Sequence, residues 1–269
     1  MKKVFKTVIT LTLLAVMLGT SLLCFAATEE KPYAYVNIYD GKTVVLAMYK
    51  VEKSDEDGDS KWTINDVLIS THNKKCKDGY TTATGDYGLY ITKLWNIDNG
   101  GSYGFYSNNV MSMGVSDAVS EDKHDVIYAF VYADAKGYSD AYSFFDKAET
   151  TGNAKDKLTL TAKYISGFDP ETYAPIEAPL DEAVIYFDGK KTEFKTDKDG
   201  KVEIELPAYS AVITAEKEGL TLIPPVCKYS IIEKSGNGAL IIAIVVTVVI
   251  AAAVVCVILL NNNKRKKAN

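Results

Sequence analysis

A run of 22 residues without a charge, from Ala239 to Leu260, constrains the fold of this chain more than any other feature. At about 1.5 Å rise per residue, a helix of this length spans the hydrocarbon core of a bilayer, which is roughly 30 Å thick. The tail that follows, residues 261–269, is basic, and positive charge beside a span stays on the cytoplasmic side. We therefore expect a single-pass membrane protein whose folded part precedes the span and lies outside the cell.

The first residues have the features of a secretory signal peptide. Three lysines precede a long apolar run, and this run ends in the small residues Ala26 and Ala27. We expect cleavage there, so that residues 1–27 are removed. Two alternatives are an uncleaved anchor and lipid attachment at Cys24, although the bulky Leu23 before that cysteine argues against lipid attachment.

Charge and cysteine usage narrow the class of protein. The net charge is −5, and both ends are basic, so the segment between them is more acidic than the whole chain. An acidic exterior argues against nucleic acid or anionic lipid as a partner. Only two cysteines, Cys76 and Cys227, lie between the two ends, and two cysteines do not form the disulfide framework of a small secreted domain. This pattern favours a bacterial surface protein, and a Gram-positive one, over a eukaryotic receptor.

Strand patterns fill the first part of the expected ectodomain, residues 28–150. Apolar and polar residues alternate from Tyr33 to Tyr39, and Asp40-Gly41 then signals a turn into a second strand. Later strands are expected over residues 85–95, 103–106, 125–133 and 140–145. This region also holds 13 of the 18 tyrosines. We therefore expect a small, mostly β domain.

The second part, residues 155–232, contains short alternating strands separated by Asp188-Gly189 and Asp199-Gly200. Asp-Gly between such strands is a strong hairpin signal, and strands every 8–12 residues predict a β-sandwich. Residues 233–238 form a short Gly- and Ser-containing linker to the span over 239–260. The predicted fold is thus mainly β, in two domains with one C-terminal transmembrane helix.

The stretch DEDGDSKWTIND, residues 55–66, has the oxygen spacing of a 12-residue calcium loop. A helix over Ile64–Lys75 is expected to follow it. Ser60 stands where the sharp turn of such a loop favours glycine. The alternative is a solvated acidic turn without an ion. The candidate metal ligands are Asp55, Asp57, Asp59, Lys61 through its carbonyl, Thr63 and Asp66.

Several of these segments resemble known families. The stretches YGLYITKLWNIDNGGSYGFYSNNV and VSDAVSEDKHDVIYAFVY resemble the transcobalamin-like C-terminal domain family, also called domain of unknown function 4430. Lys123-His124-Asp125 departs from the Gly-Asp turn of that family. The resemblance implies a small α+β domain, and it suggests a corrinoid such as cobalamin as ligand, because the related domain of transcobalamin-type proteins covers one face of cobalamin.

Two further resemblances concern the loop and the second domain. DEDGDSKWTIND resembles a dockerin-type calcium loop, although dockerins carry two such loops and this chain has one. Residues 182–220 resemble the Ig-like, carboxypeptidase-regulatory-type sandwiches of bacterial surface proteins. The second resemblance implies a spacer between the membrane and the first domain.

Aromatic residues near glycine-rich turns suggest a ligand site in the first domain. Exposed rings at strand ends can stack on a flat ligand, and an asparagine can supply hydrogen bonds. The alternative is ordinary sheet packing, which favours Tyr and Phe on strands. The candidate ligand-binding residues are Trp95, Tyr103, Tyr106 and Asn108.

No catalytic pattern accompanies these features. The only histidines, His72 and His124, are far apart, and the sequence has no nucleophile elbow, phosphate loop or C-x-x-C motif. We expect no enzyme. Two classes of function stay open, a surface protein that binds a small ligand and a structural or adhesive surface protein. The first predicts an open aromatic groove on the first domain, and the second predicts an exposed strand edge or flat patch instead.

Overall fold

The computed structural model describes residues 31–232, which form several β-sheets and a single α-helix, α2 (Ile64–Lys75). The predicted mainly β class is therefore confirmed, and the predicted helix has the expected bounds. No helix within residues 31–232 is long and apolar enough to cross a membrane. The predicted signal peptide, residues 1–27, and the predicted linker, span and tail, residues 233–269, lie outside the described residues.

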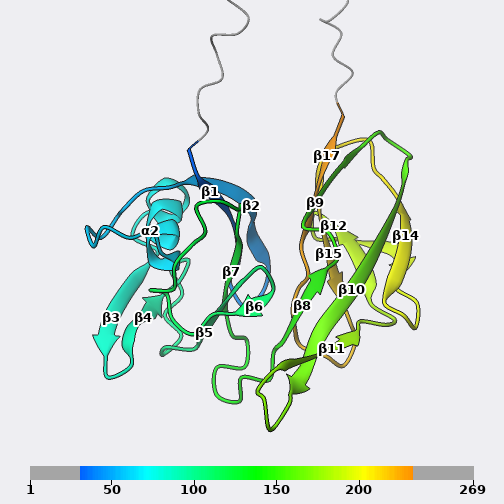
Figure 1. Cartoon of the computed structure of the whole chain (residues 1–269). Helices are drawn as coiled ribbons and strands as arrows, with labels where there is room; N and C mark the ends of the chain where they lie inside the picture. Colours follow the sequence, from blue (N-terminus) through cyan, green and yellow to red (C-terminus); the bar gives the residue numbers. More distant parts are fainter. Residues whose placement is uncertain (1–30, 233–269) are drawn as a thin grey trace, which may run out of the picture.

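The first seven strands and α2 make up one part of the protein (Figure 1). They are β1 (Tyr33–Tyr39), β2 (Val44–Glu52), β3 (Thr81–Gly85), β4 (Gly88–Lys93), β5 (Tyr103–Ser107), β6 (Val110–Met111) and β7 (Val126–Val131). Five of them form one sheet in the order β2-β1-β7-β5-β6, with β1 parallel to β7 at its centre. The hairpin β3–β4 forms a separate two-stranded sheet.

Successive side chains of a strand point to opposite faces of the sheet. In the centre of the five-stranded sheet, side chains on both faces are buried, because each face packs against another part of the protein. Val36, Ile38 and Ile127 belong to a core shared with α2. Tyr128 and Phe130, on the other face, belong to a second cluster shared with later strands. Glycine at position 104 leaves space for the Phe130 ring, since a Cβ at this position would lie 2.3 Å from Cζ of Phe130.

The remaining strands form two facing sheets. They are β8 (Ala141–Phe145), β9 (Glu149–Gly152), β10 (Lys157–Phe168), β11 (Pro175–Pro179), β12 (Val184–Phe187), β13 (Lys190–Lys195), β14 (Lys201–Glu205), β15 (Ala211–Glu216), β16 (Leu222–Ile223) and β17 (Cys227–Ile231). One sheet has the order β11-β10-β8-β16, with β14 also on β10, and the other has the order β13-β12-β15-β17-β9. A hydrophobic core lies between them.

Strand pairing moves the boundary between the two parts of the chain. The sequence analysis placed residues 140–150 in the first domain. In the structure β8 pairs with β10 and β16, and β9 pairs with β17, so both strands belong to the second group of sheets. The local strand pattern was recognised, but alternation alone does not say which sheet a strand joins. Cys76 and Cys227 are both free thiols.

Aromatic side chains join the two parts of the protein. The rings of Tyr106 and Tyr142 stack 3.7 Å apart at an angle of 3°. The Tyr142 hydroxyl donates to Asn109 Oδ1 at 2.9 Å, and the Tyr128 hydroxyl donates to the carbonyl of Pro224 at 2.9 Å. Burial raises the pKa of Tyr106 to about 12. These contacts fix the five-stranded sheet against the second group of sheets.

The two ends of the described chain lie at the same end of the molecule. Figure 1 shows the start of β1 and the end of β17 at the top, each on its own part of the protein, whereas the β3–β4 turn and the β10–β11 loop lie towards the bottom. A membrane anchor after residue 232 would therefore leave the β3–β4 hairpin on the side away from the membrane.

Candidate ligand groove and acidic loop

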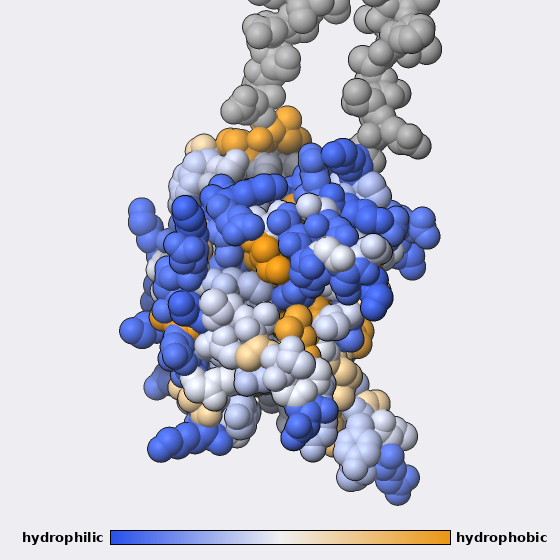
Figure 2. Space-filling model, turned by 90° about the vertical axis from the view of Figure 1, so that its left-hand side faces the viewer, coloured by the Kyte–Doolittle hydropathy of each residue, from blue (hydrophilic) through white to orange (hydrophobic). Residues whose placement is uncertain are grey.

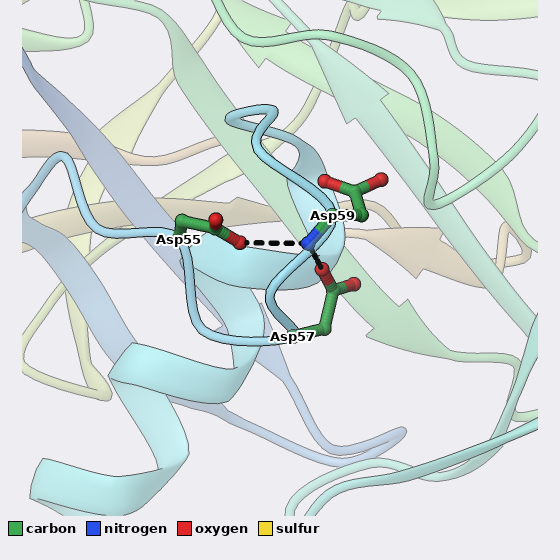
Figure 3. Close-up of side chains that lie close together, drawn as sticks. All are labelled: Asp55, Asp57 and Asp59. Carbon is green, nitrogen blue, oxygen red and sulfur yellow. Dashed lines mark hydrogen bonds between the residues drawn. The ribbon is translucent and has the colours of Figure 1, made fainter.

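The structure brings three of the six predicted metal ligands together. Carboxylate oxygens of Asp55, Asp57 and Asp59 lie within 4.8 Å of one another, and all three residues are exposed. Figure 3 shows the Asp59 amide between the first two carboxylates, donating to Asp55 Oδ1 at 3.1 Å and Asp57 Oδ1 at 3.3 Å. Ser60 has a φ of 65°, the left-handed turn that this loop position requires. The loop therefore holds three carboxylates around one point.

The other three predicted ligands have different partners. Thr63 is the N-cap of α2, and its side chain and that of Asp66 form a capping box. Asp66 is fully buried and also accepts the amides of Glu56 at 2.8 Å and Asp57 at 3.4 Å. Lys61 was predicted to act through its carbonyl; its ammonium lies 3.8 Å from Asp59 Oδ2. Asp66 thus joins the loop to the start of the helix through hydrogen bonds.

A chain of side chains connects the acidic loop to the β3–β4 hairpin. Asn65 donates to Asp57 Oδ2 at 2.8 Å and accepts the Tyr80 hydroxyl at 2.9 Å. The Tyr80 ring stacks on His72, with 5.1 Å between centroids. Burial, followed by the nearby charges of Asp66 and Asp57, raises the pKa of Tyr80. Because Tyr80 directly precedes β3, this chain fixes one end of the hairpin.

The strand that leaves the hairpin at the same end also contacts His72, which is buried. Its Nδ1 lies 2.6 Å from the Leu68 carbonyl, so Nδ1 carries the proton. Nε2 is then free to accept the Trp95 amide at 3.3 Å, and the Trp95 ring meets the imidazole edge to face. The neutral ring therefore holds both Tyr80 and Trp95, on either side of the hairpin.

We expect protonation of His72 to destabilise the protein in acid. Burial lowers the pKa of His72, and the Leu68 carbonyl opposes this only in part. A lowered folded-state pKa means that stability declines as pH falls below the unfolded pKa of 6.5 towards the folded value. Thermal unfolding from pH 7.5 to pH 5 checks this. The loss should be smaller in His72→Gln, whereas His124→Gln, which changes the other histidine, should behave like the wild type.

The four predicted ligand-binding residues do not form one site. Tyr106 is buried against Tyr142, and Trp95 packs on His72. Asn108 closes the turn between β5 and β6, donating to Asp125 Oδ1 at 2.7 Å and accepting the Val126 amide at 2.9 Å. Of the four, only Tyr103 borders the groove described next.

An open groove of about 490 Å³ lies between the β3–β4 hairpin and the end of the five-stranded sheet. Its walls are mostly apolar and include five glycines and one charged residue, Asp86. Two large side chains at its rim are almost fully exposed, with Tyr87 at 105% and Met113 at 92%. In Figure 2, which views the side of the hairpin, hydrophobic residues emerge in small patches from a largely hydrophilic surface. The lining residues are Gly85–Ile91, Gly101, Tyr103–Phe105, Met111–Gly114 and Tyr132.

The sequence analysis missed most of this groove. It identified Gly85–Gly88 as the start of a strand and did not consider Tyr87 or Met113. The sequence did contain one signal for the groove, namely Tyr87 in a turn between Gly85 and Gly88. A large side chain in such a turn has no neighbouring strand to cover it and is therefore expected to be exposed. The position of β4 beside β5 results from tertiary packing, and the sequence of neither strand alone predicts it.

A second, smaller cleft of about 220 Å³ lies between the two parts of the protein. Its polar groups already have internal partners. Asn109 accepts the Tyr142 hydroxyl, Ser143 donates to the Ile223 carbonyl, and Asp146 accepts the Thr161 amide. The larger groove is therefore the better candidate for a binding site.

No protein-family model and no curated protein sequence matches this chain. The candidate site accordingly rests on the geometry of the groove and on the acidic loop.

Proposed function

We propose that this protein is a binding protein of a bacterial cell surface, and that it is held by a C-terminal membrane helix over residues 239–260. Its N-terminal part, which we propose is a transcobalamin-like α+β domain, would bind a small ligand such as a corrinoid in the groove between β4 and β5. The β-sandwich would act as a spacer. The open, largely apolar groove carries this proposal, because ligand sites are concave, mostly apolar and furnished with few polar groups.

The position of the groove supports this proposal. The hairpin turn that borders the groove lies opposite the end of the molecule where the chain leaves β17 (Figure 1). A ligand could therefore reach the groove from outside without meeting the membrane. The exposed rims at Tyr87 and Met113 also place apolar surface in water, which is a feature of interaction sites.

Cobalamin is the first small ligand to test, because the resemblance of the N-terminal part suggests a corrinoid. Equilibrium dialysis of the full chain with cobalamin should show saturable binding. The double variant Tyr87→Ala/Met113→Ala should bind about tenfold or more weakly, because both side chains border the groove. Tyr173→Ala removes another exposed ring, on the sandwich, and should not change binding. Equal binding by all three proteins would contradict a site in the groove.

We further propose that calcium binds the acidic loop as a structural ion. Three converging carboxylates suit a hard cation, and extracellular sites of this kind bind with dissociation constants of roughly 10⁻⁴–10⁻³ M. At about 10 mM calcium, linkage then predicts a stabilisation of roughly 1.4–2.7 kcal/mol. Calorimetry should show a higher melting temperature with calcium than with chelator. The variant Asp55→Asn/Asp57→Asn/Asp59→Asn should show no such difference, and a shift that survives in this variant would place the ion elsewhere.

The second candidate is a structural or adhesive surface protein without a small ligand. One observation favours it. The tip formed by the end of β10, the loop that follows it and the start of β11 exposes Phe168, Tyr173 and Ile176 at the end of the sandwich. Loss of adhesion in Tyr173→Ala, together with unchanged behaviour of the groove variant, would support this candidate over the first.

A further inference from the structure

We propose that the ligand of the groove is an extended peptide segment of a partner protein, which pairs with the open edge of β4. This inference rests on the proposed binding function and names the class of ligand. Addition of a strand to a sheet edge is a common mode of peptide recognition, in which main-chain hydrogen bonds supply affinity and side-chain pockets supply specificity.

The groove is bordered by the edges of strands. Side chains of successive residues alternate between the two faces of a strand, so a cavity on one face is lined by every second residue. Here consecutive residues line the groove on both sides, Gly88 to Ile91 of β4 and Tyr103 to Phe105 of β5. The main chain of both strands therefore faces the groove.

The β4 edge is open among the described residues. β4 pairs only with β3, so one edge over its six residues has no registered strand. On the other side of the groove, β6 pairs with β5 at Tyr106 and Ser107, and the Ser112 amide donates to the Phe105 carbonyl at 3.2 Å. An unpaired edge presents N–H and C=O groups that another strand can satisfy.

The hairpin and β5 are in contact at one end of the groove and apart at the other. The Tyr103 side chain fills the space beside Thr92, where its hydroxyl donates to the Thr92 carbonyl at 3.0 Å. Directly paired strands lie about 4.8 Å apart. An added strand would therefore pair with Gly88 to Ile91, the residues of β4 that line the groove.

The charge of the lining narrows the kind of partner segment. The lining contains one carboxylate, Asp86, and no cationic side chain, so it complements a neutral apolar segment flanked by lysine or arginine. A corrinoid would use the apolar walls but would leave the β4 edge unpaired.

Selection of displayed random 12-residue peptides against the full chain tests this inference. Selected peptides should alternate apolar residues, and Tyr87→Ala/Met113→Ala should weaken their binding about tenfold. Single N-methylation along a selected peptide separates main-chain pairing from side-chain contact. Binding should fall about tenfold or more at every second central position, because alternate amides point towards β4. The positions between them should tolerate the methyl group.

Two outcomes would overturn the inference. One is a selected peptide whose binding is unchanged by N-methylation at every position. The other is the absence of any peptide that depends on the groove. If cobalamin still binds the groove in that case, the proposed binding function stands and only the peptide inference fails.

Discussion

Tyr142→Ala is expected to lower the free energy of unfolding by about 3–5 kcal/mol, the usual effect of removing a buried aromatic ring. Tyr142 is 5% exposed and stacks on Tyr106 where the five-stranded sheet meets the sandwich. Its ring also contacts Tyr128 and Phe130. The substitution would therefore open a cavity in the interface that fixes the two parts together.

Tyr142→Phe is the matched control. It keeps the stacked ring and removes only the hydrogen bond to Asn109, so a loss of about 1 kcal/mol is expected. Urea unfolding of the two variants measures both changes. A loss below about 1 kcal/mol in Tyr142→Ala would show that the interface contributes little to stability. Separate unfolding transitions in this variant alone would show that the ring couples the two parts.

Asp66→Asn is expected to destabilise the protein by about 3 kcal/mol. The Asp66 carboxylate is fully buried and accepts the main-chain amides of Glu56, Asp57 and Thr63. Hydrogen bonds to a charged group contribute about 1.5–3 kcal/mol each, and an amide side chain would point one of its own donors at these donors. The N-cap interaction of α2 would weaken as well.

This substitution also separates two roles for Asp66. The sequence indicates a calcium ligand, and the structure shows a helix cap. A cap predicts the same loss of stability with calcium and with chelator, whereas a ligand predicts a larger loss when calcium is present. Asp59→Asn is the control, because Asp59 is exposed and its loss should change stability by less than about 0.5 kcal/mol in chelator.

Local patterns predicted the local structure of this chain. The calcium-loop pattern predicted that a helix follows over Ile64–Lys75, as α2 does, and alternation predicted β1 and β7. The aromatic residues were harder to interpret, because both faces of the five-stranded sheet are buried. Tyr106 looks the same in sequence whether it faces a ligand or a neighbouring sheet. The structure places it against Tyr142, a residue 36 positions away.

The candidate site depends on contacts that no local pattern contains. The groove exists because the β3–β4 hairpin lies beside β5 without pairing to it, and His72 on α2 contacts both strands at the base of that hairpin, through Tyr80 and Trp95. The acidic loop was the clearer signal, since metal-ligand spacing is a property of one short segment. Its last predicted ligand, Asp66, instead takes part in the capping box of α2, because position 12 of the loop is also the third residue of the helix.

Amide hydrogen exchange of the full chain, with and without its tightest ligand among cobalamin and the selected peptides, tests the central claim most directly. The account predicts that the ligand slows exchange in the groove, over residues 85–91, 103–105 and 111–114, and leaves the acidic loop unchanged. Protection confined to the cleft at Asn109 and Asp146, or to the tip between β10 and β11, would contradict it.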